Sequence, residues 1–222
     1  MHSLNLWKTI LILHEILQKF RNISIMIYFT SDTHYGHKNI VSGISKWDDK
    51  SRCRDFKNLE DHNNKIVDSI NSVVGQEDTL YHLGDWSFGG AENIFRFRER
   101  IICQNVHIIL GNHDENIYKN RDGCHEVFES VSSYLEIKID DDHIVLSHWP
   151  MKIWNNYHKG TWQLHGHCHN NLKDDEWWTK SKRRRTMDVG VDTNNYKPYS
   201  YEDLKRIMEK LKDYPTDLDH HK

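Results

Sequence analysis

Short apolar runs recur along this chain, and each is followed at once by polar side chains. Runs of this length, bounded by turn-forming residues, are typical of buried β-strands. We therefore predict six strands. They cover residues 25–29 (IMIYF), 79–83 (TLYHL), 106–110 (VHIIL), 143–146 (HIVL), 161–165 (TWQLH) and 187–191 (MDVGV).

In several of the segments between these runs, apolar residues recur at helical spacing. A first helix is predicted by apolar residues on one face, at Phe56, Leu59, Ile66, Val67, Ile70 and Val74, with Asn63 on the same face. Ile94, Phe95, Phe97 and Ile101 predict a second helix. A third begins at Ser200, where Asp203 stands at the right distance to complete a cap, and its stripe is Leu204, Ile207, Met208 and Leu211. Strands that alternate with helices indicate a layered α/β fold.

Composition narrows the class of protein. The chain has 222 residues, which favours a single domain with a sizeable core. Its net charge of -3 gives no general attraction to nucleic acid or to an anionic membrane. No apolar stretch approaches the roughly 18 residues that a membrane span requires. The four cysteines lack paired spacing, which predicts a reducing, cytoplasmic setting.

The first 25 residues form a separate segment. Leu6, Ile10, Leu13 and Leu17 follow helical spacing, whereas no cleavage site of small residues follows them. Residues 1–25 are either an added amphipathic helix or a dispensable extension before a start at Met26. The main domain would then span residues 26–222. The oligomeric state stays open.

The polar residues that follow the predicted strands share one chemical character. In open α/β sheets, ligands bind beyond the carboxyl ends of the strands. Carboxylate, amide and imidazole groups suit divalent ions of the Mn, Fe, Zn or Ni type. Seven or eight such groups are too many for one ion and suit two ions that share a carboxylate and clamp a phosphate. The residues are Asp32, His34, Asp85, Asn112, His113, His148, His167 and His169.

Five short motifs carry a family resemblance. The patterns D-x-H, G-D, G-N-H-D, S-H-x-P and G-H-x-H, in this order between residues 32 and 169, resemble the calcineurin-like metallophosphoesterase superfamily. The local sequences "TSDTHYGHKNI", "YHLGDW" and "LHGHCH" are similar to small bacterial and phage-borne members. The resemblance implies an α-β-β-α architecture, a β-sandwich flanked by helices, with a dinuclear metal site at one edge.

The resemblance also implies a role for each residue. One metal ion would be bound by Asp32, His34 and His169, the other by Asn112, His148 and His167, with Asp85 shared. His113 would contact a phosphoryl oxygen and protonate the leaving oxygen, while Asp114 would hold the His113 ring. A metal-bridging hydroxide would attack phosphorus in line. We expect Mn²⁺ as the metal, with Fe, Ni or Zn as alternatives.

Three further residues are candidates for substrate contact. His37 lies close to the D-x-H motif, and Arg52 and Arg54 carry guanidinium groups that suit phosphate oxygens. The basic run 180–185 (KSKRRR), next to Trp177 and Trp178, is interpreted as a solvated loop rather than a strand-binding rim.

These observations predict a metal-dependent phosphoesterase acting on a small molecule. A phosphodiester of nucleotide type, such as a cyclic nucleotide, is favoured because a leaving alkoxide needs the proton that His113 would supply. One alternative is a nuclease that acts on ends or single strands and uses the basic run. The other is a non-catalytic interaction module that retains its metals for structure.

Overall fold

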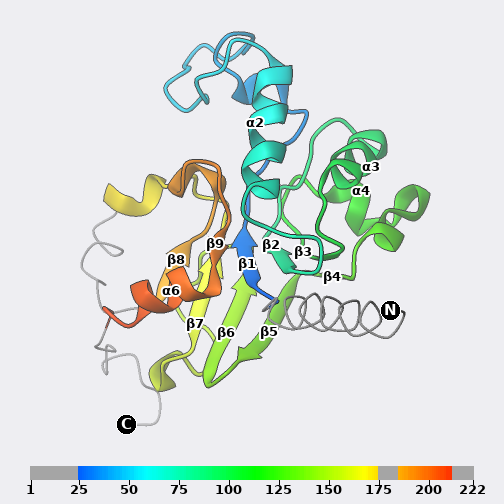
Figure 1. Cartoon of the computed structure of the whole chain (residues 1–222). Helices are drawn as coiled ribbons and strands as arrows, with labels where there is room; N and C mark the ends of the chain where they lie inside the picture. Colours follow the sequence, from blue (N-terminus) through cyan, green and yellow to red (C-terminus); the bar gives the residue numbers. More distant parts are fainter. Residues whose placement is uncertain (1–24, 175–184, 212–222) are drawn as a thin grey trace, which may run out of the picture.

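The computed structural model describes residues 25–174 and 185–211. It contains two β-sheets (Figure 1). The first has the order β4-β3-β2-β1-β9. Its members are β1 (Ile27–Thr30), β2 (Thr79–His82), β3 (Asn105–Ile109), β4 (Ser130–Ser132) and β9 (Tyr199–Ser200), of which β9 alone runs antiparallel to its neighbour.

The second sheet has the order β5-β6-β7-β8. It consists of β5 (Tyr134–Ile139), β6 (Asp142–Ser147), β7 (Trp162–His165) and β8 (Thr186–Asp188). The strands β6, β7 and β8 are parallel, and β5 pairs with β6 as an antiparallel hairpin. An isolated bridge between Ser31 and Gly190 links the end of β1 to the segment after β8.

All six predicted strands are confirmed. The last is shorter than predicted, because Val191–Thr193 forms a 3-10 turn (η5) instead of extending the strand. Three strands were not predicted, namely β4, β5 and β9. Of these, β5 had a readable pattern, since Leu135, Ile137 and Ile139 alternate with polar residues and are the less exposed positions of the strand.

The three predicted helices are also confirmed as α2 (Leu59–Asn71), α3 (Ala91–Arg100) and α6 (Tyr201–Met208). The Ser200 side chain accepts a hydrogen bond from the backbone N–H of Asp203, as the cap predicted. The structure adds α4 (Glu115–Tyr118) and four further 3-10 turns. These are η1 (Lys38–Ile40), η2 (Arg121–Val127), η3 (Tyr157–Lys159) and η4 (Asn171–Asp174).

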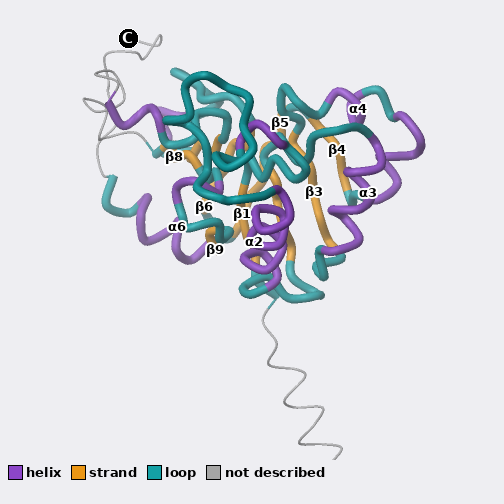
Figure 2. The backbone as a smooth tube through the Cα atoms, turned by 90° about the horizontal axis from the view of Figure 1, so that it is seen from above, coloured by secondary structure: helices purple, strands orange, loops and turns teal. Residues whose placement is uncertain are grey.

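The strands of the first sheet bury both faces. Tyr28 packs with the cluster that contains Ile66 and Phe97, from α2 and α3. Its neighbour Phe29 points the other way, into the cluster formed with Ile144 of the second sheet. Figure 2 shows the strands enclosed between helical segments. The expected α/β class, two sheets flanked by helices, is therefore confirmed.

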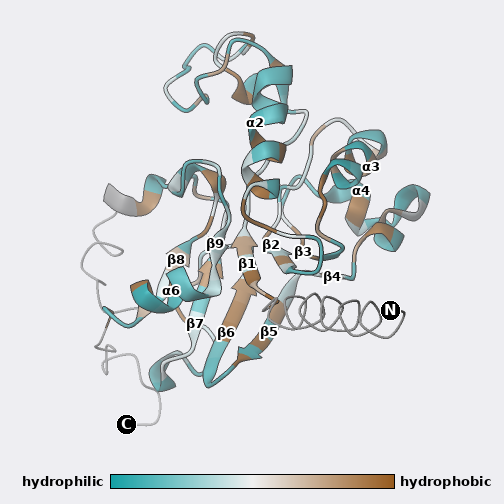
Figure 3. Ribbon diagram, in the orientation of Figure 1, coloured by the Kyte–Doolittle hydropathy of each residue, from teal (hydrophilic) through white to brown (hydrophobic). Residues whose placement is uncertain are grey.

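Hydropathy follows this layering. Figure 3 shows hydrophobic residues concentrated on β1 and β6, whereas α3 and α6 carry mainly hydrophilic residues toward solvent. On the outer face of the second sheet, Val145 packs against Trp154 and Tyr157 from the segment that follows β6. No helix in the described ranges has the length and apolar content needed to span a bilayer. The predicted extension, apart from Ile25, lies outside the described residues.

Candidate metal centre

The seven predicted metal ligands come together at one edge of the two sheets. Each follows a parallel strand, which fits the rule that parallel strands present their carboxyl ends to a shared site. Asp32 and His34 follow β1, Asp85 follows β2, Asn112 follows β3, His148 follows β6, and His167 and His169 follow β7.

The first ligand group consists of Asp32, His34 and His169. The Nε2 atoms of the two histidines lie 3.1 Å apart. The Oδ1 atom of Asp32 lies 3.7 Å from the Nε2 of His169 and 4.0 Å from the Nε2 of His34. One ligand atom from each residue therefore points at a common centre, which suits a single cation.

The second ligand group consists of Asn112, His148 and His167. The side-chain oxygen of Asn112 lies 3.1 Å from the Nε2 of His148 and 3.0 Å from the Nδ1 of His167. His148 is buried, whereas Asn112 and His167 are exposed toward solvent. This group therefore forms the open side of the centre.

Asp85 lies between the two groups. Its Oδ2 atom is 3.5 Å from the Nε2 of His34 and 3.7 Å from the Nε2 of His148. Its other oxygen accepts a hydrogen bond of 3.0 Å from the backbone N–H of His113. The Asp85 carboxylate is thus placed to contact cations in both groups.

Backbone strain is concentrated at these ligands. A positive φ is uncommon for residues other than glycine, and it costs free energy that the surrounding structure has to supply. Five of the seven ligands adopt one, namely Asp32 (56°), His34 (48°), Asp85 (57°), His167 (70°) and His169 (47°). Clustered strain of this kind is typical of functional sites.

The donor set fits divalent cations. Asp32 and Asp85 are almost fully buried. Among the described residues, the ion pairs of these two carboxylates run only to histidines: His34, His148 and His169. Burial, with a smaller contribution from the nearby Asp85, raises the pKa of Asp32 to about 7 against the opposing effect of His169. Because buried carboxylates are costly unless paired or metal-bound, the arrangement suits bound metal ions.

Two of the ligand rings are oriented by contacts at their other nitrogen. The Nδ1 of His148 lies 2.7 Å from the backbone oxygen of Leu83, and the Nδ1 of His169 lies 2.7 Å from a carboxylate oxygen of Asp192. An acceptor at Nδ1 holds the proton there and leaves Nε2 free to bind a cation. Asp192 directly follows the predicted strand 187–191, and it was not among the predicted site residues.

Arg54 makes contacts other than the predicted phosphate contact. Its guanidinium pairs with both oxygens of Asp192 at 2.8 Å. It also donates to the backbone oxygens of Asp32 (2.6 Å) and Thr33 (3.1 Å), and one nitrogen lies 3.1 Å from the Nε2 of His62. These five contacts match its five N–H groups. Arg54 also lines the cleft, so its contact with substrate stays a prediction, while its observed hydrogen bonds support the metal centre.

Arg54 supports the first ligand group. Although burial acts in the opposite direction, the Arg54 guanidinium holds the pKa of Asp192 well below its ordinary value. Asp192 therefore stays ionised beside the His169 ring. The buried Arg54 side chain donates directly to the backbone of Asp32, and through Asp192 it also positions the His169 ring.

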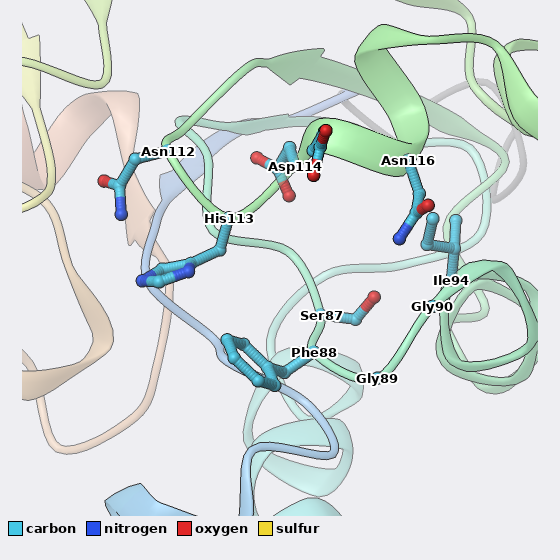
Figure 4. A pocket seen from close by; sticks show the side chains of 10 residues that line it. Ser87, Phe88, Gly89, Gly90, Ile94, Asn112, His113, Asp114 and Asn116 are labelled. Atoms are coloured by element: carbon cyan, nitrogen blue, oxygen red, sulfur yellow. The ribbon is translucent and has the colours of Figure 1, made fainter.

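Asp114 also differs from its predicted role. Its carboxylate accepts hydrogen bonds from the backbone N–H groups of Asp85, Trp86 and Gly111, at 2.8, 3.0 and 2.8 Å. Figure 4 shows the Asp114 carboxylate set apart from the His113 ring. The prediction that Asp114 holds this ring is wrong, because its oxygens are used to join the turns that follow β2 and β3.

His113 faces the solvent side of the centre. It is exposed, and its ring centroid lies 5.5 Å from that of His34 and 5.2 Å from that of Phe88. His37 is buried nearby, with its ring centroid 6.2 Å from that of His113. Burial lowers the pKa of His37 to about 4, which keeps its ring neutral.

A cleft of about 860 Å³ opens over the centre. His34, His113 and His169 line it, together with Trp47 and Arg52. Arg52 is exposed there, so its position suits the predicted substrate contact. Of the basic run 180–185, Arg185 alone is described. Trp177 and Trp178 lie outside the described residues.

Comparison with known proteins places the chain among small relatives. An uncharacterized protein of Methanocaldococcus jannaschii is 31% identical over 188 residues, which cover 84% of this chain and 93% of that protein. The gene 66 protein of Mycobacterium phage L5 is 29% identical over 191 residues, covering 74% of this chain and 86% of that protein.

A solved structure supports the same grouping. The crystal structure of a protein of unknown function from Aquifex aeolicus is similar with a TM-score of 0.62 at 26% identity, and the match covers 83% of this chain and 100% of that one. The family model described as calcineurin-like phosphoesterase matches residues 25–218. Together with the candidate metal-ligand groups, this makes the protein a metal-dependent phosphoesterase. The chain belongs to the calcineurin-like phosphoesterase family.

Proposed function

We propose that the protein hydrolyses phosphodiesters of nucleotide type with two divalent transition-metal ions. The observation that carries this proposal is the position of His113, which is exposed in the cleft beside two ligand groups that share Asp85. An exposed imidazole next to the phosphate site is placed to protonate a poor leaving group, and a diester with an alkoxide leaving group requires such a proton.

The ligand groups would hold the two cations, with Mn²⁺ favoured over Fe, Ni or Zn. When bound, the cations supply positive charge against the phosphoryl oxygens and lower the pKa of a nearby water. Asp32, His34 and His169 would hold the more buried cation, and Asn112, His148 and His167 would hold the more exposed one. Asp85 would serve both, and it also accepts a hydrogen bond from the backbone N–H of His113.

This last contact couples the cation site to the proton donor. Because Asp85 accepts a hydrogen bond from the backbone N–H of His113 at 3.0 Å, the backbone that carries the His113 ring is held next to the cation site. Asp114 strengthens the arrangement, since it ties the backbone of Asp85 to that of Gly111. His113 would then donate its proton at the leaving oxygen, and Arg52 would contact phosphate from the same cleft.

The proposal includes a reducing, cytoplasmic location. All four cysteines are free thiols. Burial raises the pKa of Cys168, which lies between two ligands, to about 12 and keeps it as an unreactive thiol rather than a competing ligand. A small-molecule substrate, rather than a protein or a nucleic acid, agrees with the net charge of -3.

The test compares leaving groups in the Mn²⁺-loaded protein. We expect hydrolysis of bis(p-nitrophenyl) phosphate and of a cyclic nucleotide, and slower hydrolysis of the monoester p-nitrophenyl phosphate. His113→Ala should lower kcat for the cyclic nucleotide by about 100- to 10,000-fold, the usual contribution of a general acid. The loss should be smaller for p-nitrophenyl esters, whose leaving group needs no proton.

The matched control is His143→Ala, since His143 is an exposed histidine on β6 outside the centre. Metal content is measured for each variant by elemental analysis. No hydrolysis of any ester by protein that carries two metal ions per chain would leave the non-catalytic module as the better interpretation. Equal losses for both leaving groups would contradict the role of His113 as proton donor.

A further inference from the structure

Three aromatic side chains form one wall of the cleft. Trp47 is 42% exposed and Phe88 is 38% exposed, which is unusual for rings of this size. Between them lies His37, stacked on Phe88 with ring centroids 4.1 Å apart and planes inclined by 13°. The ring centroids of Trp47 and His37 lie 5.8 Å apart, with the ring planes inclined by 81°. We call Trp47, His37 and Phe88 the aromatic wall.

The aromatic wall begins at the proton donor. The Phe88 ring centroid lies 5.2 Å from that of His113, and Figure 4 shows the two rings close together with Phe88 toward the 87–90 turn. All three wall residues line the same cleft as the ligands His34 and His169. A group that leaves from a phosphate at the metal centre would therefore depart toward the aromatic wall.

The loop that carries Trp47 is fixed at its base. The backbone N–H of Arg54 donates to Ile40 at 2.7 Å, and that of Ser42 donates to Arg54 at 3.0 Å. Since the Arg54 side chain is also bound to the metal centre, the loop and the centre share one anchor. Figure 1 shows this segment, between β1 and α2, extending beyond the carboxyl end of β1.

The dimensions of the cleft suit more than a phosphate. Its volume of about 860 Å³ lies in the range of sites for drug-sized ligands. Exposed aromatic faces next to a basic side chain, here Arg52, are the usual platform for a nucleobase, because every base presents a flat face for stacking. An aliphatic or purely sugar leaving group would leave these rings in contact with water.

We propose that the aromatic wall binds the planar base of a nucleoside leaving group, and that Trp47 and Phe88 determine this specificity. The inference rests on the proposed function, since it assigns a recognition site to the same reaction. The phosphate lies at the metal centre, the ribose passes His113, and the base stacks on the exposed face of the wall.

A binding experiment tests the proposed base site without any turnover of substrate. Two phosphonates with a P–C bond in place of the ester are titrated calorimetrically into Mn²⁺-loaded protein, one built on adenosine and one on ribose without the base. We expect the adenosine compound to bind about 5- to 100-fold more tightly, the range reported for stacking of one base on an aromatic side chain. Trp47→Ala should remove most of this preference, and Trp47→Phe should retain it.

The matched control is Tyr134→Ala, because Tyr134 is an exposed aromatic residue on β5, outside the cleft. Equal binding of the two phosphonates by the unchanged protein would overturn the proposal. So would a Trp47→Ala variant that loses affinity for both compounds alike. If the base preference is found but no ester is hydrolysed, the aromatic wall stands and the proposed function fails.

Discussion

The two ligand groups are held in different ways. Behind the first group lies a side-chain network, in which Arg54 and Asp192 position His169 and the backbone of Asp32. The second group is supported by the backbone, since the His148 ring contacts the backbone oxygen of Leu83. One half therefore depends on contacts between side chains, and the other on a contact with the backbone at the end of β2.

This difference leads us to expect unequal metal sites. Asp32 and His34 are buried, whereas Asn112 and His167 are exposed. Ligands that are already oriented lose less conformational freedom when a cation binds. Two binding steps of different affinity should appear on titration with Mn²⁺, and the tighter should belong to the first group.

The largest expected effect breaks the main-chain support of the second group. Gly84 has a φ of +93°, and a Cβ there would lie 2.6 Å from both the Nδ1 of His148 and the backbone nitrogen of Gly111. Gly84→Ala should lower the free energy of unfolding by about 3 kcal/mol, through backbone strain together with overpacking. It should also weaken the looser metal-binding step.

Gly90→Ala isolates the packing contribution. Gly90 has a similar φ of +95°, but a Cβ there would meet nothing within 4 Å. Gly90→Ala should lower the free energy of unfolding by only about 1–2 kcal/mol, through backbone strain. Both variants are compared by urea unfolding of metal-free protein. Equal losses would mean that close approach to His148 does not support the second group.

The sequence was sufficient for six of the nine described strands and for the position of the candidate ligands at one edge, because both follow a local rule. Apolar runs such as 106–110 mark buried strands, and the residues directly after them must lie at the carboxyl edge. Asn112 and His148 could be selected on that basis. The contacts of Arg54 could not be predicted in this way, because an arginine before a helix has the same local pattern whether it binds phosphate or Asp192. Only the fold brings these two residues, 138 positions apart, into contact.

The same reasoning explains the error at Asp114. Its neighbour His113 seemed the natural partner, since the two are adjacent in the sequence. Side chains of consecutive residues diverge at a turn, so the Asp114 carboxylate reaches Trp86, on the turn after another strand, instead. Local strain would have been equally hard to foresee, since the positive φ of His34 depends on its tertiary contacts.

A moderate effect is expected when the side-chain network of the first group is broken. Lysine cannot reproduce the five donors of Arg54, so Arg54→Lys should release Asp192 and the backbone of Asp32. Changes in residues that orient metal ligands typically reduce affinity by about 10- to 100-fold. We expect this loss in the tighter of the two Mn²⁺-binding steps, measured by calorimetry on metal-free protein.

Asp192→Asn gives an independent check, because it keeps the side-chain shape and removes the charge beside His169. It should weaken the same step in the same direction. Arg206→Lys, on the exposed face of α6, serves as control. Equal weakening of both steps by Arg54→Lys would argue against a network dedicated to the first group.

The smallest effect concerns a single ring contact in the second group. Trp149 is 47% exposed, and its ring centroid lies 4.3 Å from that of His167. Aromatic pairs of this kind contribute about 0.5–1.5 kcal/mol, so Trp149→Ala should weaken the looser Mn²⁺-binding step by roughly two- to tenfold. Trp149→Phe should restore most of the affinity. Because the side chain is half exposed, unfolding in urea should change by less than about 0.5 kcal/mol. A loss in the tighter step instead would show that the two groups are coupled through Asp85 rather than supported separately.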